Sequence, residues 1–218
     1  MTPRTTIRAG GVALIVGAVA FMGVFSYLAA SFDYPEILDG AAADVLPRLL
    51  ATGDAGRAAW AFYAFLPLAW IPAGVGAYFA LRRTHAGAML VAMQFALLSA
   101  ISMMLGLMRW PTVHWRLADL QATAVTTGAT EQQQVIAALF DGLNSYLGNY
   151  IGEFLGEFSF SMFFLLSSWA LWRSRTTATW VWALGFLTAG AGFIGMFRKV
   201  TDAVAMVALV PLSWALNV

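Results

Sequence analysis

The chain contains no cysteine, and charged residues make up only 11% of its 218 residues. Without cysteine, the protein can form no disulfide, no catalytic thiolate, no iron–sulfur cluster and no cysteine-ligated zinc site. Soluble domains average about 25% charged residues, so the low charge argues against a soluble protein. The formal net charge is +1, which leaves no basic footprint for nucleic acid.

Catalytic signatures are missing as well. The sequence holds no Gly-x-Ser-x-Gly elbow, no phosphate-binding loop and no His-Glu-x-x-His pair. An enzyme would have to use two glutamates, Glu153 and Glu157, as its acid and base, and nothing else in the sequence points to such chemistry. We therefore do not expect a catalytic function.

Apolar residues dominate instead, at 61% of the chain. A bilayer core about 30 Å thick needs roughly 20 helical residues to cross it. Six segments meet or nearly meet this length, so the sequence predicts an all-α integral membrane protein whose residues 1–218 form one six-helix bundle. The expected spans are residues 10–30, 58–81, 86–108, 146–172, 179–197 and 203–218.

Basic residues predict the orientation of the bundle. Six spans place equal numbers of basic residues on the two sides, but one side packs its arginines into very short segments: Arg4, Arg8, Arg82, Arg83, Arg173 and Arg175. On the other side the basic residues are diluted in the long segments 31–57 and 109–145. The positive-inside rule then puts both termini in the cytoplasm.

A short surface helix is expected before the fourth span. Thr130 to Gln133 reads as a capping box that opens an amphipathic helix. An unbroken helix from there to Trp172 would exceed 60 Å at about 1.5 Å per residue. We therefore expect a bend at residues 142–144, with the first part lying on the outer membrane surface.

Two acidic residues occur inside the fourth predicted span. On an α-helix, residues four apart share a face, so Asn149, Glu153, Glu157 and Ser161 would form one polar stripe. Glu157 precedes Arg173 by 16 positions, or about 24 Å, which puts it about 6 Å below the outer edge of the core. A carboxylate there needs a partner or water. Arg109, Arg198 and His114 are candidate partners on the same side.

This stripe has three possible roles. It can be a structural ion-pair network that ties the fourth helix to its neighbours, or an outward-open acidic pocket for a cation, a proton or a polar headgroup. Metal binding with His114 is a special case, but the second Glu-x-x-His element of carboxylate-bridged sites is missing. His85 and His114 are expected on opposite sides, so they cannot hold a haem together. We predict no cofactor and no metal.

Glycines form a second series beside the polar stripe. Gly148, Gly152 and Gly156 make a small-xxx-small pattern, which permits two helices to approach closely. The partner helix can belong to the same bundle or to another subunit.

Several short motifs resemble a known family. They are Arg8-Ala9-Gly10-Gly11, the run at residues 62–69, and Leu143-Asn144-Ser145-Tyr146-Leu147-Gly148 followed by Gly152-Glu153. Their order is similar to that in a bacterial family of six-helix membrane proteins, the domain of unknown function of the 4386 series. The resemblance implies the fold and a bacterial inner membrane as the location, and it draws attention to Glu153, but it supplies no activity and no cofactor.

Two functions follow from these features. The first is a non-catalytic accessory or scaffold subunit that packs in a membrane complex, with the lipid bilayer and other membrane subunits as partners and no nucleic acid. The alternative is a binding or transport protein with an acidic outer pocket at Glu153 and Glu157. A transporter needs polar groups along both halves of its pathway, and the inner halves of these helices offer almost none, so we rank this alternative second.

Overall fold

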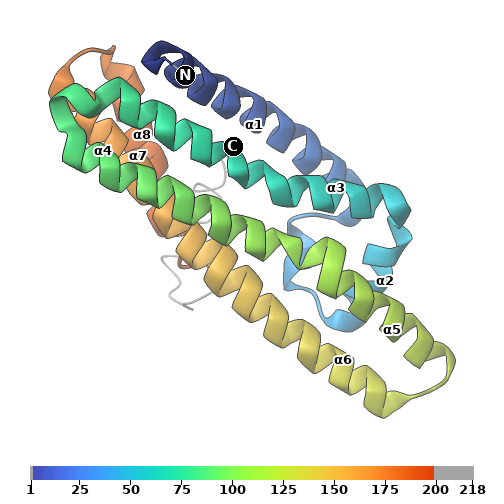
Figure 1. Cartoon of the computed structure of the whole chain (residues 1–218). Helices are drawn as coiled ribbons and strands as arrows, with labels where there is room; N and C mark the ends of the chain where they lie inside the picture. Colours follow the sequence, from blue (N-terminus) through green and yellow to red (C-terminus); the bar gives the residue numbers. More distant parts are fainter. Residues whose placement is uncertain (1, 199–218) are drawn as a thin grey trace.

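The computed structural model describes residues 2–198, and over this range the chain is helical and contains no strand, which confirms the all-α prediction (Figure 1). The predicted span 203–218 lies outside the described residues. The elements in chain order are α1 (Pro3–Phe32), η1 (Glu36–Asp39), α2 (Ala42–Ala51), α3 (Gly53–Phe65), η2 (Leu66–Ala69), α4 (Trp70–Met108), η3 (Trp110–His114), α5 (Trp115–Thr126), α6 (Thr130–Leu143), η4 (Asn144–Leu155), α7 (Gly156–Ser174) and α8 (Thr179–Gly195).

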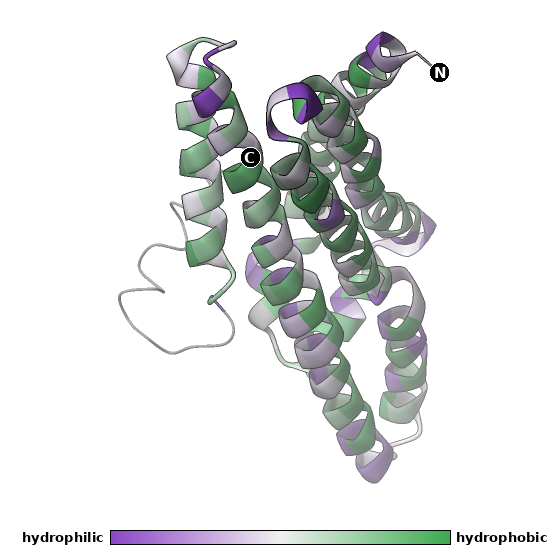
Figure 2. Ribbon diagram, turned by 60° about the vertical axis from the view of Figure 1, so that its left-hand side comes forward, coloured by the Kyte–Doolittle hydropathy of each residue, from purple (hydrophilic) through white to green (hydrophobic). Residues whose placement is uncertain are grey.

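Three continuous helical stretches are long and apolar enough to cross a membrane, judged by length and composition. They are Pro3–Phe32, Gly53–Thr126 and Thr130–Ser174, and the apolar helix Thr179–Gly195 is shorter. Figure 2 shows hydrophobic residues along the middle of the long helices and hydrophilic residues near the ends of the bundle.

Helix α4 folds back on itself at His85. The backbone of this residue is non-helical, with φ −139° and ψ 46°. Gly74 and Ala96 lie at equal distances along the chain on either side of it, and a Cβ added to Gly74 would lie 2.7 Å from the Cβ of Ala96. The two arms of α4 are therefore antiparallel neighbours. The predicted span 58–81 covers α3, η2 and the first arm, and the predicted span 86–108 covers the second arm.

Small residues let neighbouring helices come close to one another. A Cβ added to Gly10 of α1 would lie 2.6 Å from the carbonyl oxygen of Pro72 and 3.0 Å from the Cα of Gly76, both in the first arm of α4. The second arm meets η4 in the same way, since a Cβ on Gly106 would lie 2.6 Å from the Cα of Gly152. Helix α7 packs on α4 and then on α8. The first five predicted spans thus fall on helices that pack one against the next.

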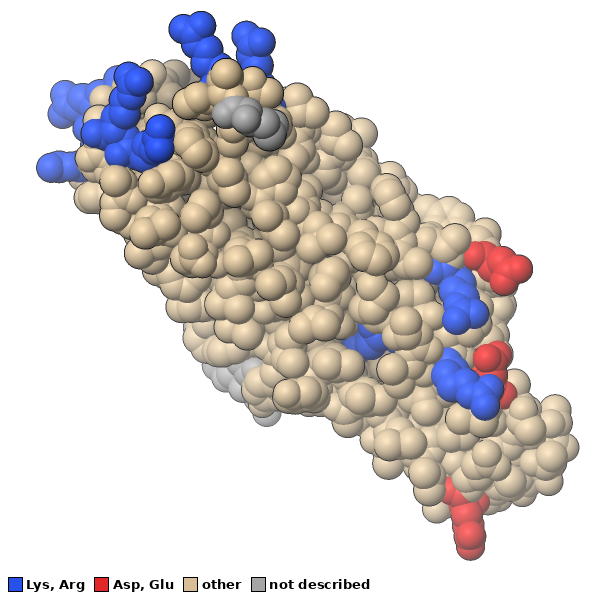
Figure 3. Space-filling model, viewed as in Figure 1, with Lys and Arg blue, Asp and Glu red and all other residues tan. Residues whose placement is uncertain are grey.

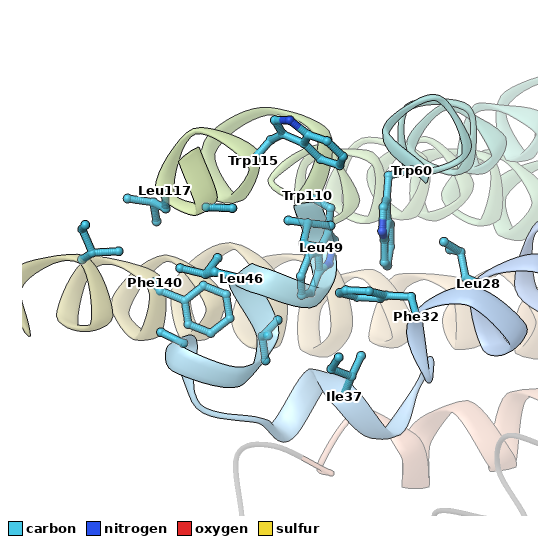
Figure 4. Close-up of a cluster of buried hydrophobic side chains, with 14 of the residues drawn as sticks. Leu28, Phe32, Ile37, Leu46, Leu49, Trp60, Trp110, Trp115, Leu117 and Phe140 are labelled. Atoms are coloured by element: carbon cyan, nitrogen blue, oxygen red, sulfur yellow. The ribbon is translucent and has the colours of Figure 1, made fainter. Parts of the chain in front are cut away.

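A separate apolar core forms at the end of the bundle where α2, α5 and α6 meet the ends of α1 and α3. Its centre is aromatic, and Figure 4 shows Phe32, Trp60 and Trp110 pointing toward one another. Trp60 and Trp110 are stacked at 4.9 Å, and Phe32 meets each of them edge-on. Pairs of this kind add to the stabilisation that area burial provides. The hairpin of α5 and α6 extends this end of the molecule (Figure 1).

The bend expected at residues 142–144 is absent, so this prediction was wrong. Residues 130–174 form one continuous helical stretch, and Asn144 has helical angles of φ −64° and ψ −45°. Helix α6 packs on α5 and α2 and buries Ile136 and Phe140, while Val135 and Leu139 of the same helix stay exposed. The predicted capping box at Thr130 to Gln133 is also absent. The N-cap of α6 is Ala129, which has no side-chain hydrogen bond, and the side chain of Gln133 donates to the carbonyl oxygen of Ala124 at 3.2 Å.

Charge is divided between the two ends of the molecule. In Figure 3, one end carries only basic residues, and the acidic residues visible on this face lie toward the other end together with further basic ones, with a largely uncharged band between the two ends. The arginine-rich end holds the N-terminus of α1, the turn at His85 and the end of α7.

Candidate functional site

A cavity of about 280 Å³ lies between α1, α4 and the helical rod formed by η4 and α7. Six polar side chains line it: Tyr34, Tyr63, Arg109, Glu153, Glu157 and Arg198. The remaining lining is largely apolar and includes Leu14, Phe21, Leu66, Trp70, Met103 and Phe160. Two of the predicted site residues on the fourth span, Glu153 and Glu157, therefore meet both predicted arginines at one cavity.

The cavity is elongated along the helices and differs in polarity between its ends. On α1 its lining runs from Leu14 to Phe25, which spans about 16 Å at 1.5 Å per residue. Tyr34, Tyr63, Arg109 and the Glu153–Arg198 pair line one part of the cavity, whereas Glu157 precedes Phe160 by only three residues, or about 4.5 Å along the helix, and so lies next to the apolar part. The opposite end is aromatic and apolar, with Trp70 and Phe160 in edge-on contact at 4.8 Å. A cavity with this arrangement suits a molecule that has one polar and one apolar end.

Glu153 and Arg198 form an ion pair at the cavity. Their side chains are only 19% and 13% exposed, so water screens the pair little. Glu153 belongs to η4 and Arg198 follows α8, so the pair connects the fourth and fifth predicted spans. The expected ion-pair network is thus represented by one contact within the described range.

Arg109 is a buried cation held by neutral acceptors. Its side chain is at the end of α4, and the residue is 5% exposed. Nε and Nη2 donate to Oδ1 of Asn144 at 3.1 and 3.0 Å, and Nη1 donates to the carbonyl of Gly106. Gly148 leaves the room for this group, because a Cβ added there would lie 2.5 Å from Nη2. The guanidinium also lies over the ring of Trp110, 5.2 Å from its centroid.

Glu157 lies deeper along the fourth helix than the ion pair. Its Oε2 atom is buried and has no hydrogen-bond partner among residues 2–198. A buried oxygen without a partner carries a desolvation cost that a bound donor would relieve. Glu157 thus offers the cavity a buried hydrogen-bond acceptor that no other group in the described chain uses.

Two tyrosines, Tyr34 and Tyr63, also line the cavity. The hydroxyls of Tyr34 and Tyr63 are 3.3 Å apart and share a hydrogen bond. Burial raises the pKa of Tyr34 above its ordinary value, so its hydroxyl stays neutral and available as a donor near neutral pH.

Two of the four residues of the predicted polar stripe line the cavity. Residues 144–155 form a π-helix, in which residue i bonds residue i+5. Glu153 and Glu157 belong to the cavity lining, whereas Asn149 does not. Ser161 is buried and faces α8, because a Cβ added to Gly192 would lie 2.2 Å from its Oγ. Asn144, which holds Arg109, was missed; the repeat of polar residues on an assumed α-helix gave no sign of it.

His114 lies away from the carboxylates. It is fully buried in the aromatic core, with Trp110 and Phe140 rings each 4.7 Å from its own, and neither ring nitrogen has a hydrogen-bond partner in the described chain. No group of three or more potential ligands, from His, Cys, Asp and Glu, comes together within residues 2–198 in a way that could hold a metal ion.

The glycine series faces α4 of the same chain. Gly152 abuts the backbone of Gly106, and a Cβ added to Gly156 would lie 2.8 Å from the Cγ of Met103. Together with Gly148, which faces Arg109, these residues bring the fourth helix onto the second arm of α4.

Comparison with known proteins gives a family without an assigned activity. No curated protein and no solved structure matches the chain. The model of a family described as a domain of unknown function, DUF4386, matches residues 9–217. The match covers almost the whole sequence, and the chain therefore belongs to this family.

Proposed function

We propose that the chain is an integral membrane protein with six spans and both termini in the cytoplasm, in the inner membrane of a bacterium. The apolar helices support this topology by length and composition. The successive packing of α1, the two arms of α4, α7 and α8 supports an up-and-down bundle. The arginine-rich end would face the cytoplasm, as the positive-inside rule requires.

We further propose that this bundle binds a small amphipathic molecule in its cavity. The observation that carries this proposal is the lining itself, which combines six polar side chains with an apolar remainder. The volume of about 280 Å³ has room for on the order of nine water-sized groups. It would therefore take a polar head with a short apolar portion, and a longer chain would extend beyond it.

The charges of the lining favour a head without net charge. Arg109 and Arg198 supply two positive charges, and Glu153 and Glu157 can supply two negative ones. Opposed charges at one site give no strong preference for a cation or an anion, so we infer that the head is uncharged or zwitterionic. Glu157 would hydrogen-bond this head through its unpartnered oxygen. We therefore rank ligand binding above the accessory-subunit function, although the sequence alone favours the accessory subunit.

The accessory-subunit function remains a second proposal. The sequence favours it through its lack of catalytic motifs and of polar groups in the inner halves of the helices. The glycine series, which could have met another subunit, packs on α4 within the chain, so no particular surface among the described residues is assigned to a partner. Co-purification of another membrane protein at fixed stoichiometry would favour it.

The binding proposal is tested by Glu157→Gln, which keeps the shape of the side chain and removes its charge. Wild-type and variant protein would be extracted from native membranes, and the bound small molecules measured by mass spectrometry. The amide oxygen of glutamine can still accept a hydrogen bond, but a bond to a charged group is worth about 1–1.5 kcal/mol more than a neutral one, so occupancy under limiting ligand should fall by about five- to tenfold. Glu131→Gln removes an exposed carboxylate on α6 and serves as the control.

The same variants separate ligand binding from structure. If Glu157→Gln lowers the melting temperature but leaves the amount of bound molecule equal to that of Glu131→Gln, the carboxylate is structural and the binding proposal fails.

A further inference from the structure

Six exposed arginines gather at the end of the bundle that is opposite the aromatic core (Figure 3). They come in three pairs: Arg4 and Arg8 near the start of α1, Arg82 and Arg83 before the turn in α4, and Arg173 and Arg175 at the end of α7. None of these residues is part of the cavity lining.

Packing contacts bring the three pairs together. A Cβ added to Gly76 of α4 would lie 3.3 Å from the carbonyl oxygen of Thr6, so the start of α1 lies beside the helix that leads to the turn. The ring of His85, at the turn itself, contacts the ring of Trp169 at 5.0 Å and holds the turn against the end of α7. The arginines therefore form one basic surface and not three separate ones.

This basic surface is not neutralised from within the described chain. None of the six arginines forms an ion pair with a carboxylate among residues 2–198. The sequence holds no Asp or Glu in the segments 2–32, 58–118 and 158–198 from which this end is built. Within residues 2–198, no carboxylate offsets the positive charge of this surface.

Exposed aromatic residues border the basic surface. Trp172 and Trp180 are 45% and 68% exposed near the end of α7 and the start of α8. Tryptophan is enriched where lipid headgroups meet the apolar core of a bilayer. The arginines thus lie at the level at which headgroups would meet the protein.

We propose that this end binds anionic phospholipid headgroups. Arginine pairs with phosphate oxygens in a bidentate manner, and several guanidinium groups at one level can hold more than one phosphate. A zwitterionic headgroup carries a cation that offsets its phosphate, whereas phosphatidylglycerol keeps a net negative charge. Each basic residue close to an anionic membrane surface is worth about fivefold in affinity.

The test uses the full chain in neutral detergent, titrated with phosphatidylglycerol or phosphatidylcholine, with bound lipid counted by native mass spectrometry. Wild-type protein should bind phosphatidylglycerol at least about tenfold more tightly than phosphatidylcholine, and added salt should reduce the difference. The double variant R82Q/R83Q should lose at least about fivefold in affinity for phosphatidylglycerol, while R82K/R83K should lose little.

R48Q/R116Q removes two exposed arginines from the opposite end of the molecule, where Arg48 pairs with Asp33, and is the control for the number of charges removed. Equal binding of the two lipids by wild-type protein would overturn the proposal, and this comparison needs no variant. An equal loss in R82Q/R83Q and R48Q/R116Q would also overturn it, because the effect would then follow overall charge and not this surface.

Discussion

The guanidinium of Arg109 donates two hydrogen bonds to a single oxygen, Oδ1 of Asn144, at 3.1 and 3.0 Å. Arg109 ends the second arm of α4, and Asn144 begins the π-helix η4. The amide of Asn144 in turn donates to the carbonyl of Leu38 at 3.4 Å. One asparagine thus connects three segments that surround the polar end of the cavity.

Asn144→Ala should destabilise the protein by about 2–3 kcal/mol. The substitution removes the acceptor of two bonds from a buried cation, and the loss of a partner leaves part of its desolvation cost uncompensated. Thermal unfolding in detergent would measure the effect. Asn149→Ala is the matched control, because Asn149 makes no side-chain hydrogen bond within the described chain and lies outside the cavity lining. Similar losses in the two variants would show that the Arg109 contact is not stabilising.

Gly152→Ala should cost about 1–3 kcal/mol. Its added methyl group would lie 2.9 Å from the Cα of Gly106, and a backbone atom cannot yield without moving α4 or η4. Gly142→Ala in α6 has open space around the new Cβ and should be neutral or stabilise by up to about 1 kcal/mol. The difference in melting temperature between the two variants measures the close approach. A neutral Gly152→Ala would argue against it.

His114→Leu should leave stability unchanged or raise it by about 1 kcal/mol. The imidazole is fully buried and its two nitrogens find no hydrogen-bond partner among residues 2–198, so the substitution removes an uncompensated polar group. Trp110→Ala, in contact with the same ring, should cost about 3–5 kcal/mol because it empties the centre of the aromatic core. A strong loss in His114→Leu would reveal a polar partner for the imidazole.

The helical bundle could be expected from the sequence because its signals are long and local. Runs of apolar residues mark the helices, and Arg82 and Arg83 mark the place where α4 turns at His85. The glycine series correctly indicated a close helix approach, and the structure identifies Gly106 as the residue that faces Gly152.

The geometry of the site was harder to predict because it depends on contacts between segments far apart in the sequence. A four-residue repeat groups Asn149 with Glu153 and Glu157, yet only the two glutamates line the cavity. The pairing of Arg109 with Asn144 joins residues 35 positions apart, which no local pattern records. The bend before the fourth span was expected because an unbroken helix would be much longer than a bilayer core, and the structure has that long helix, with α6 packed on α5 and α2.

Substitution inside the cavity tests the central proposal most directly. Leu14 lines the cavity, whereas Val16 on the same helix is 60% exposed and is not part of the lining. Leu14→Trp should fill part of the cavity, and Val16→Trp adds the same side chain on the outside of α1. Native mass spectrometry of protein extracted from its own membranes should find a small amphipathic molecule bound to wild-type protein and to Val16→Trp, and little or none bound to Leu14→Trp. Equal occupancy in all three proteins, or no bound molecule in wild-type protein, would contradict the proposal that this cavity holds a ligand.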